Sequence, residues 1–99
     1  MAFAVSEMGI TPVELLSHRR ASHLVAARAL YVWIVKTYGP DFLSYRTIGE
    51  WLGQRDHSTI VHLWKEVAPR LRRLDPDFLL LCDRFTEQVA KELEVPQCH

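Results

Sequence analysis

The stretch GQRDHSTI, residues 53–60, decides the fold, because a short turn inside it joins two predicted helices. Ser44 can cap the first helix, and Gly53 ends it since glycine tolerates a left-handed backbone conformation. Asp56 can cap the second helix. Apolar residues then recur at helical spacing and form the core-facing stripe of that helix: Ile60, Trp64, Val67 and Leu71. Two helices joined by a tight turn that contains glycine predict a helix-turn-helix.

A short helix is predicted well before this motif. Thr11 is a suitable N-cap, Pro12 suits the first helical position, and Glu14 can close a capping box. We expect the helix to end near Ser17. The sequence HRRA that follows, residues 18–21, indicates a basic loop between this helix and the next.

The longest apolar helix is predicted to begin after Ser22 as its N-cap and to end at the pair Gly39-Pro40, which forbids continuation. It is apolar on almost every face, which is typical of a central helix buried by its neighbours. One face at helical spacing carries Leu24, Tyr31, Ile34 and Tyr38. The three tryptophans, each on an apolar face, are expected to contribute to one core: Trp33, Trp51 and Trp64.

The chain after the helix-turn-helix is predicted to form a closing helix at about residues 76–94. Pro69 is expected to bend or break the helix before it, and Asp75 is the N-cap that starts the closing helix. The apolar stripe of this helix consists of Phe78, Leu81, Cys82, Phe85, Val89 and Leu93. Leu79 and Leu80 widen the stripe, and we expect the rest of the fold, rather than a dimer partner, to cover it.

Length and composition indicate a single domain over residues 1–99, of the all-α class with five or six helices. The chain is 48% apolar and 24% charged, as folded domains are, and no segment alternates like a strand. No apolar run approaches the roughly 20 residues of a membrane span, and the first residues lack the features of a secretion signal. We therefore expect a cytoplasmic protein with no membrane partner.

The two cysteines are expected to be reduced thiols, since no CxxC spacing occurs and nothing indicates a secreted protein. Cys82 lies on the stripe of the closing helix and is expected to be buried, whereas Cys98 is expected to be exposed. No metal site and no cofactor are predicted.

The net charge is zero, but the charges are unevenly distributed. Between His18 and Arg73, ten Lys or Arg oppose four Asp or Glu, whereas residues 74–99 carry six acidic and two basic side chains. Because salt screens surface fields beyond about 8 Å, the local excess of positive charge decides whether a polyanion is attracted. From composition alone, a charge pattern that merely keeps the domain soluble is an equal alternative.

Residues 53–60 resemble GGRDHTTV, the signature of the C-terminal DNA-binding domain of the bacterial replication initiator DnaA. Upstream, VELLSHRR at residues 13–20 resembles the short helix and the basic loop of that family. Single residues also fall at matching places: Lys36, Ile48, Gly49 and His62. The resemblance covers roughly residues 5–73 and implies a Trp-repressor-like helix-turn-helix fold.

The resemblance also implies which residues meet DNA. Base-edge contacts in the major groove are implied for the start of the recognition helix: Asp56, His57, Ser58 and Thr59. Arg20 would enter the adjacent minor groove, where a narrow A·T stretch attracts a guanidinium. Phosphate contacts are expected at Arg19, Arg28, Lys36, Arg46, Arg55, His62 and Lys65. Without the resemblance, Asp56 would be a helix cap and the next three would be ordinary first-turn residues.

The sequence departs from the family pattern in three respects. Residues 21–29 read ASHLVAARA where the family reads roughly SRSVARPRQ, so two basic residues and a glutamine are missing. About two residues are inserted around residues 39–42. No GxxxxGK[ST] motif occurs, so the nucleotide-binding part of the initiator is not expected. Fewer phosphate contacts would weaken binding and lower its salt dependence.

The leading hypothesis is sequence-specific binding of double-stranded DNA at DnaA-box-like sites, which would regulate replication initiation or transcription. The protein would act as a monomer or weak dimer associated with the nucleoid. The alternative, favoured by the reduced basic loop and the zero net charge, is an interaction module that binds the initiator or another replication factor without reading DNA. An enzyme is the least favoured class, because His57 and His62 do not share a helical face and no spacing suggests a nucleophile with its base.

Overall fold

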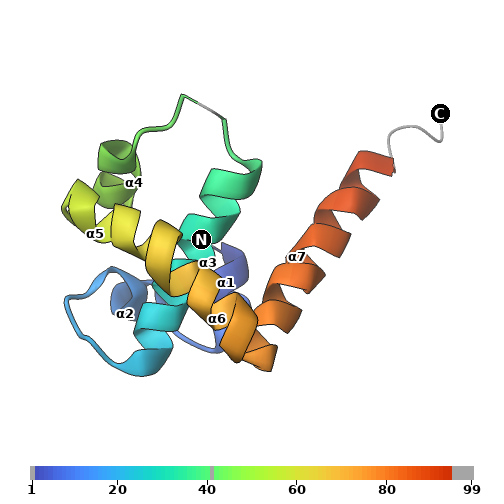
Figure 1. Ribbon diagram of the computed structural model, residues 1–99, viewed down its shortest axis with the longest axis horizontal. Helices are drawn as coiled ribbons and strands as arrows, with labels where there is room; N and C mark the ends of the chain where they lie inside the picture. Colours follow the sequence, from blue (N-terminus) through green and yellow to red (C-terminus); the bar gives the residue numbers. More distant parts are fainter. Residues whose placement is uncertain (1, 41, 95–99) are drawn as a thin grey trace.

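A computed structural model describes residues 2–40 and 42–94. Its elements are the α-helices α1 (Ala2–Met8), α2 (Pro12–Leu16), α3 (Ser22–Tyr38), α4 (Tyr45–Trp51) and α5 (His57–His62), the π-helical turn η1 (Leu63–Val67), and the α-helices α6 (Ala68–Leu74) and α7 (Pro76–Glu94). Because α5, η1 and α6 follow one another without a gap, they form one helix. The described residues thus contain six helical segments and no strand (Figure 1), which confirms the all-α prediction.

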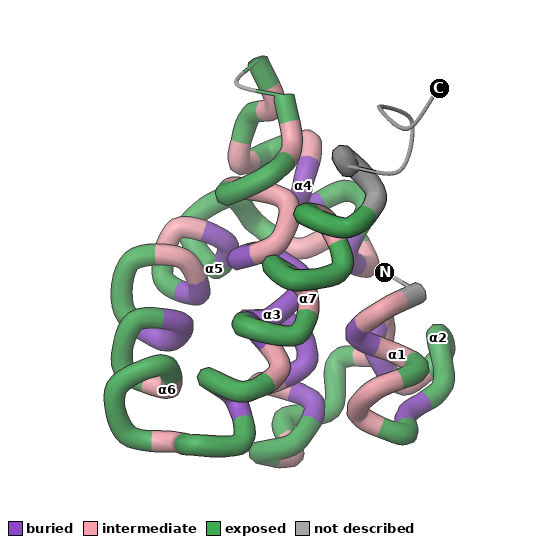
Figure 2. Tube along the Cα trace, turned by 90° about the vertical axis from the view of Figure 1, so that its right-hand side faces the viewer, coloured by how far each residue is buried: buried purple, intermediate pink, exposed green. Residues whose placement is uncertain are grey.

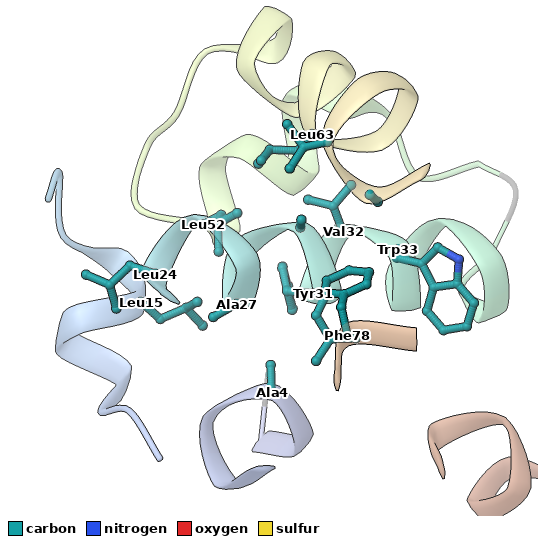
Figure 3. Packing of buried hydrophobic residues seen from close by; sticks show 14 of the residues in the cluster. Ala4, Leu15, Leu24, Ala27, Tyr31, Val32, Trp33, Leu52, Leu63 and Phe78 are labelled. Atoms are coloured by element: carbon teal, nitrogen blue, oxygen red, sulfur yellow. The ribbon is translucent and has the colours of Figure 1, made fainter. Parts of the chain in front are cut away.

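Helix α3 is the centre of the core. Its buried residues include Leu24, Leu30 and Val32, each fully inaccessible to solvent. Figure 3 shows side chains from the other segments around it: Ala4 from α1, Leu15 from α2, Leu52 after α4, Leu63 from η1 and Phe78 from α7. The prediction of a central buried helix is therefore confirmed, and every helical segment is positioned by contact with the same cluster.

Three of the predicted caps form. The Thr11 hydroxyl accepts from the Glu14 N–H at 3.1 Å, and the Glu14 carboxylate accepts from the Thr11 N–H at 3.0 Å, which completes the capping box of α2. The Ser44 hydroxyl accepts from the Thr47 N–H at 3.1 Å. The Asp75 carboxylate accepts from the first-turn N–H groups of α7. Each bond satisfies a backbone donor that a helix start leaves unpaired.

Two predicted caps are wrong in their chemistry. Ser22 is the first residue of α3, and Ala21 holds the N-cap position without a side-chain bond. Asp56 does hold the N-cap position of α5, but its carboxylate accepts from the Ser58 hydroxyl at 3.0 Å instead of capping the backbone. A polar residue before a helix fixes where the helix begins only to within a residue, because neighbouring side chains compete for its oxygen.

The helix that carries Pro69 is not broken there. The turn before the proline is π-helical, and the Ala68 N–H donates to the Leu63 carbonyl five residues earlier. A proline donates no hydrogen bond, and its ring crowds the carbonyl four residues before it. The wider π turn accommodates both effects, so the helix continues as α6 to Leu74.

Helix α7 is attached to α1 and to the C-terminal end of α3 by an aromatic cluster. The Phe85 ring lies 5.0 Å from that of Phe3 and 5.4 Å from that of Tyr38, which in turn lies 5.9 Å from Trp33. An Arg84–Glu7 ion pair at 2.6 Å and the aromatic contacts join the two ends of the described chain. The α1 helix was not predicted from the sequence.

Two predictions about apolar residues are wrong. Trp33 and Trp64 contribute to the core, but Trp51 is 47% exposed, because α4 packs through Ile48, Gly49 and Leu52 on an adjoining face. The widened stripe of α7 is not covered by the fold, since Leu80 is 56% exposed. Figure 2 shows α7 exposed along much of its length.

The cysteine prediction is confirmed for Cys82, which is fully buried. Cys98 and the Leu93 side chain lie outside the described residues. None of the helices in residues 2–40 and 42–94 combines the length and the hydropathy of a membrane span.

Candidate nucleic-acid interface

The turn between α4 and α5 packs closely against the helix before it. Gly53 and Gln54 both have left-handed backbone angles, with φ of 82° and 60°. The Arg55 N–H donates to the Gly49 carbonyl at 2.8 Å, and a Cβ on Gly49 would collide with the Arg55 carbonyl. The predicted helix-turn-helix is therefore formed as a tight unit in which glycine is required by both the turn and the packing.

The basic loop that follows α2 lies beside the start of α5, and a groove of about 800 Å³ runs between them. The loop contributes His18, Arg19 and Arg20 to its lining. The helix-turn-helix and the helix after it contribute Gln54, Arg55, Asp56, Ser58, Thr59, His62 and Arg70. Basic side chains outnumber the single carboxylate of this lining, so the groove is suited to a polyanion.

The residues predicted to read bases are brought together by this groove, with one exception. Arg20, Asp56, Ser58 and Thr59 line it. His57 does not line it; it is exposed at the first position of α5, and its Nδ1 lies 3.1 Å from the Asp56 carboxylate. Because α5 begins at this point, all five residues still lie at the entrance of one helix or on the loop beside it.

The Asp56 carboxylate is held in its charged form. The hydroxyl of Ser58 donates to it, and this bond, followed by the nearby His57, lowers the pKa of Asp56 below its usual value. The first turn of α5 therefore presents an ionised carboxylate whose position is fixed by two of its neighbours. A carboxylate so held can accept from a cytosine amino group but repels phosphate.

Three of the predicted phosphate contacts do not line the groove: Lys36, Arg46 and Lys65. Arg46 is the most exposed, with 86% of its side chain accessible and Glu50 at 3.6 Å. The Lys36 ammonium lies 4.6 Å from the centre of the Tyr45 ring. Lys65 is exposed on η1. Arg19, inside the groove, is exposed and only loosely paired, 4.0 Å from Glu14.

Arg28 is the clear correction among the predicted phosphate contacts. It is 4% exposed, and its guanidinium donates to backbone carbonyls of α2 and the basic loop: to Leu15 at 2.9 Å, Arg19 at 2.6 Å and Ser17 at 2.7 Å. Arg28 lines the groove, but its guanidinium donates to these carbonyls and leaves little surface for a phosphate. A sequence signal existed, because Arg28 lies four residues after the buried Leu24 and so shares its inward face.

Arg55 is half-buried, and its guanidinium also donates to backbone carbonyls. Its two terminal nitrogens donate to the carbonyls of Leu52 and Ser17. Burial lowers the pKa of both guanidinium groups, and for Arg28 the nearby charge of Arg55 lowers it further. Neither forms an ion pair with a carboxylate of residues 2–40 or 42–94. Both groups line the groove, so two positive charges lie there with carbonyl partners and without a carboxylate of the described residues.

Sequence reasoning missed three polar residues of the lining: His18, Gln54 and Arg70. The sequence indicated Arg70 only as part of a basic last turn after Pro69, where the helix was expected to bend or break. Since the helix continues, Arg70 lies on the same face as Leu63 and Val67, seven and three residues before it.

The family model described as the bacterial DnaA protein helix-turn-helix matches residues 2–67. The chain belongs to this family. The match covers α1 to η1 and thus every element of the groove except the helix turn that carries Arg70. Membership supports a DNA-binding helix-turn-helix domain of the kind used in replication initiation.

Two relatives carry the name chromosomal replication initiator protein DnaA. The protein of Methylacidiphilum infernorum is 30% identical over 77 residues, and that of Pelobacter propionicus is 28% identical over 81 residues. These matches cover 78% and 76% of this chain but only 16% and 18% of the relatives. No solved structure matches the chain significantly.

Proposed function

We propose that this DnaA-family domain binds double-stranded DNA sequence-specifically, at sites of the DnaA-box type. The observation that carries the proposal is the groove, which is lined both by Arg20 of the basic loop and by residues of the first turn of α5. A duplex places a minor groove next to each major groove, so two elements held side by side can read both at once.

Each element suits one groove. The start of α5 carries short polar side chains, Ser58 and Thr59, which allow the close approach that base edges require. His57 adds a ring with two nitrogens at the same end. Arg20 is exposed on the loop, and a long cationic side chain suits the narrow, negative minor groove of A·T-rich DNA.

Phosphates would be held by cations in the groove and elsewhere on the surface. Arg19, Arg46 and Lys65 are exposed, and His62 and Arg70 are exposed on the groove wall. Lys36 and Arg55 add charge from less exposed positions. Such contacts set affinity and register without carrying sequence information.

Occupation of such sites would regulate replication initiation or nearby transcription, since both relatives are named as chromosomal replication initiators. The protein would work at the nucleoid in the cytoplasm, as a monomer or weak dimer, and we assign it no catalytic step. The initiator itself is a second candidate partner through competition for, or joint occupation of, the same box.

The test is a salt-titrated binding assay on a labelled duplex that contains a DnaA box, compared with a scrambled duplex. We expect preference for the box at every salt concentration and a linear fall of log affinity with log salt for both duplexes. Equal affinity for the two duplexes even at low salt would refute DNA reading. The interaction module would then lead, and a pull-down with the initiator would examine it.

A further inference from the structure

One backbone carbonyl, that of Ser17, accepts from two arginines of different elements. Arg28 reaches it from α3 at 2.7 Å, and Arg55 reaches it from the turn of the helix-turn-helix. Ser17 ends α2 and begins the loop that carries Arg20. The loop and the turn therefore meet at the Ser17 carbonyl oxygen, which accepts from the guanidinium groups of Arg28 and Arg55.

Arg28 fixes more of the loop than this one carbonyl. Its Nε donates to Leu15 and its Nη2 also to Glu14, both in α2, whereas its Nη1 donates to Arg19 inside the loop. The guanidinium plane thus joins the end of α2, the beginning of the loop and α3. Planar guanidinium offers five donors in fixed directions, which a lysine ammonium cannot replace.

A second contact brings the turn against the same segment. A Cβ at Gly53 would collide with the carbonyl of Leu16, the residue before Ser17. The approach of the turn to α2 is thus close at two adjacent residues. Holding two like-charged groups there without a carboxylate is unfavourable by itself, so their carbonyl partners must compensate.

We infer that Arg28 and Arg55 are positioning residues, which lock the loop carrying Arg20 in a fixed register with the recognition helix. This inference rests on the proposed function and deepens it: the protein reads a minor and a major groove at one set spacing because the two reading elements are tied through Ser17. Neither arginine needs to touch DNA for this role.

The first test is local and needs no DNA. Arg28→Lys keeps the charge but loses the branched donors, so the loop should open more often. Trypsin cleavage of native protein after Arg19 and Arg20, followed by mass spectrometry, should accelerate about tenfold or more, because cleavage tracks the open population. Cleavage after Arg73 in α6 is the internal control, since only global unfolding would raise both rates. Unchanged cleavage after Arg19 and Arg20 would overturn the inference whether or not the protein binds DNA.

The second test measures register. A duplex with one base pair inserted between the A·T-rich end of the box and the remainder shifts the two halves by about 3.4 Å and about a tenth of a turn. Wild-type protein should bind it roughly tenfold more weakly than the intact box. In Arg28→Lys the ratio of the affinity for the intact box to the affinity for the inserted duplex should fall toward one. A variant that had merely lost stability would bind both duplexes more weakly by the same factor.

Arg55→Lys should behave as Arg28→Lys does, and Arg73→Lys, an exposed site away from the groove, should keep the wild-type ratio. If Arg28→Lys and Arg55→Lys both kept the wild-type ratio of intact-box to inserted-box affinity, the two reading elements would not be coupled through Ser17. If wild-type protein showed no preference for a box, the proposed function would fall, and the cleavage rates alone would decide whether the arginines hold the loop.

Discussion

At the scale of single residues, the interface separates side chains that can read sequence from side chains that can only hold charge. Thr59 lines the groove in the first turn of α5, with a hydroxyl and a methyl group available. Arg46 stands outside the groove and is almost fully exposed. A base edge presents a pattern of donors and acceptors, whereas a phosphate is the same at every position.

Replacing Thr59 by alanine should therefore reduce specificity. We expect a loss of about 1–3 kcal/mol on the box duplex and little change on scrambled DNA, with the same pattern for His57→Ala. Paired titrations on the two duplexes measure the difference. Equal losses on both would reassign these residues to phosphate contact.

Replacing Arg46 by alanine should have the opposite signature. Affinity should fall evenly on both duplexes, and the slope of log affinity against log salt should become shallower by about one, because one fewer counterion is released. Lys36→Ala is expected to act in the same direction. An effect of Arg46→Ala confined to the box would be inconsistent with a phosphate contact.

The buried thiol of Cys82 makes the free energy of unfolding depend on pH in the alkaline range. Burial raises its pKa to about 11, so the folded protein keeps the proton at pH values where the unfolded chain has lost it. Stability from this group is present below about pH 9 and is lost as the pH rises toward 11. Denaturant titrations at pH 8 and pH 10.5 should show a larger decline for wild type than for Cys82→Ala. Tyr31, whose pKa burial also raises, supplies the decline that the variant retains.

At the scale of elements, the turn between α4 and α5 carries the strictest backbone requirement. Gly53 combines a left-handed φ with close approach to the Leu16 carbonyl, so any side chain there meets both strain and a clash. Gln54 adopts a similar φ of 60° with a side chain that lies in the open groove. Gly53 and Gln54 therefore share a backbone region, but a Cβ is expected to destabilise the fold more at Gly53 than at Gln54.

Gly53→Ala should destabilise the domain by about 2 kcal/mol or more, through left-handed strain and displacement of α2. Gln54→Gly is the matched control, and it should be neutral or stabilising by up to roughly 1 kcal/mol because it relieves strain without creating a clash. Thermal or denaturant unfolding of both variants measures this. Equal stability of wild type and Gly53→Ala would mean that the turn relaxes freely.

The positions of most helices could be predicted from the sequence because their start and stop signals are local. The capping box at Thr11 and the caps at Ser44 and Asp75 each act within three residues. Ser22 and Asp56 show the limit of such signals. A polar residue near a helix start caps the helix only if its side-chain oxygen bonds a backbone N–H and not another donor. The groove could be anticipated only through the resemblance of residues 53–60 to a known family.

What could not be predicted depends on contacts distant in sequence. The sequence MAFA at residues 1–4 offers no capping residue type and no proline, and α1 is held by burial of Ala4 against α3 and by the Phe3–Phe85 contact. Arg28 was taken for a surface cation because its carbonyl partners lie nine to fourteen residues away. Pro69 was expected to bend or break its helix, which continues through a π turn.

At the scale of the whole molecule, the helix-turn-helix and the closing helix α7 lie on opposite sides of α3. Helices α4 and α5 lie on one side of α3, and α7 lies on the other (Figure 1). The groove is lined mainly by basic side chains, whereas the acidic residues of α7 do not line it. DNA bound in the groove, as proposed, would therefore meet mainly basic side chains, which attract a polyanion.

Because α7 begins after the family match ends at residue 67, its role can be separated from DNA reading by substitution. Phe85 packs against two rings and is half-buried, so Phe85→Ala should lower the free energy of unfolding by about 2–3 kcal/mol, less than for a fully buried phenylalanine. Thr86 donates to the Cys82 carbonyl at 3.0 Å and accepts from the Tyr38 hydroxyl at 2.6 Å, so Thr86→Val should cost about 1 kcal/mol. Measured well below the unfolding midpoint, both variants should keep the wild-type ratio of box to scrambled affinity, since no groove residue moves. A reduced ratio in a fully folded Phe85→Ala would instead make α7 part of the reading machinery, coupled to the groove through α3.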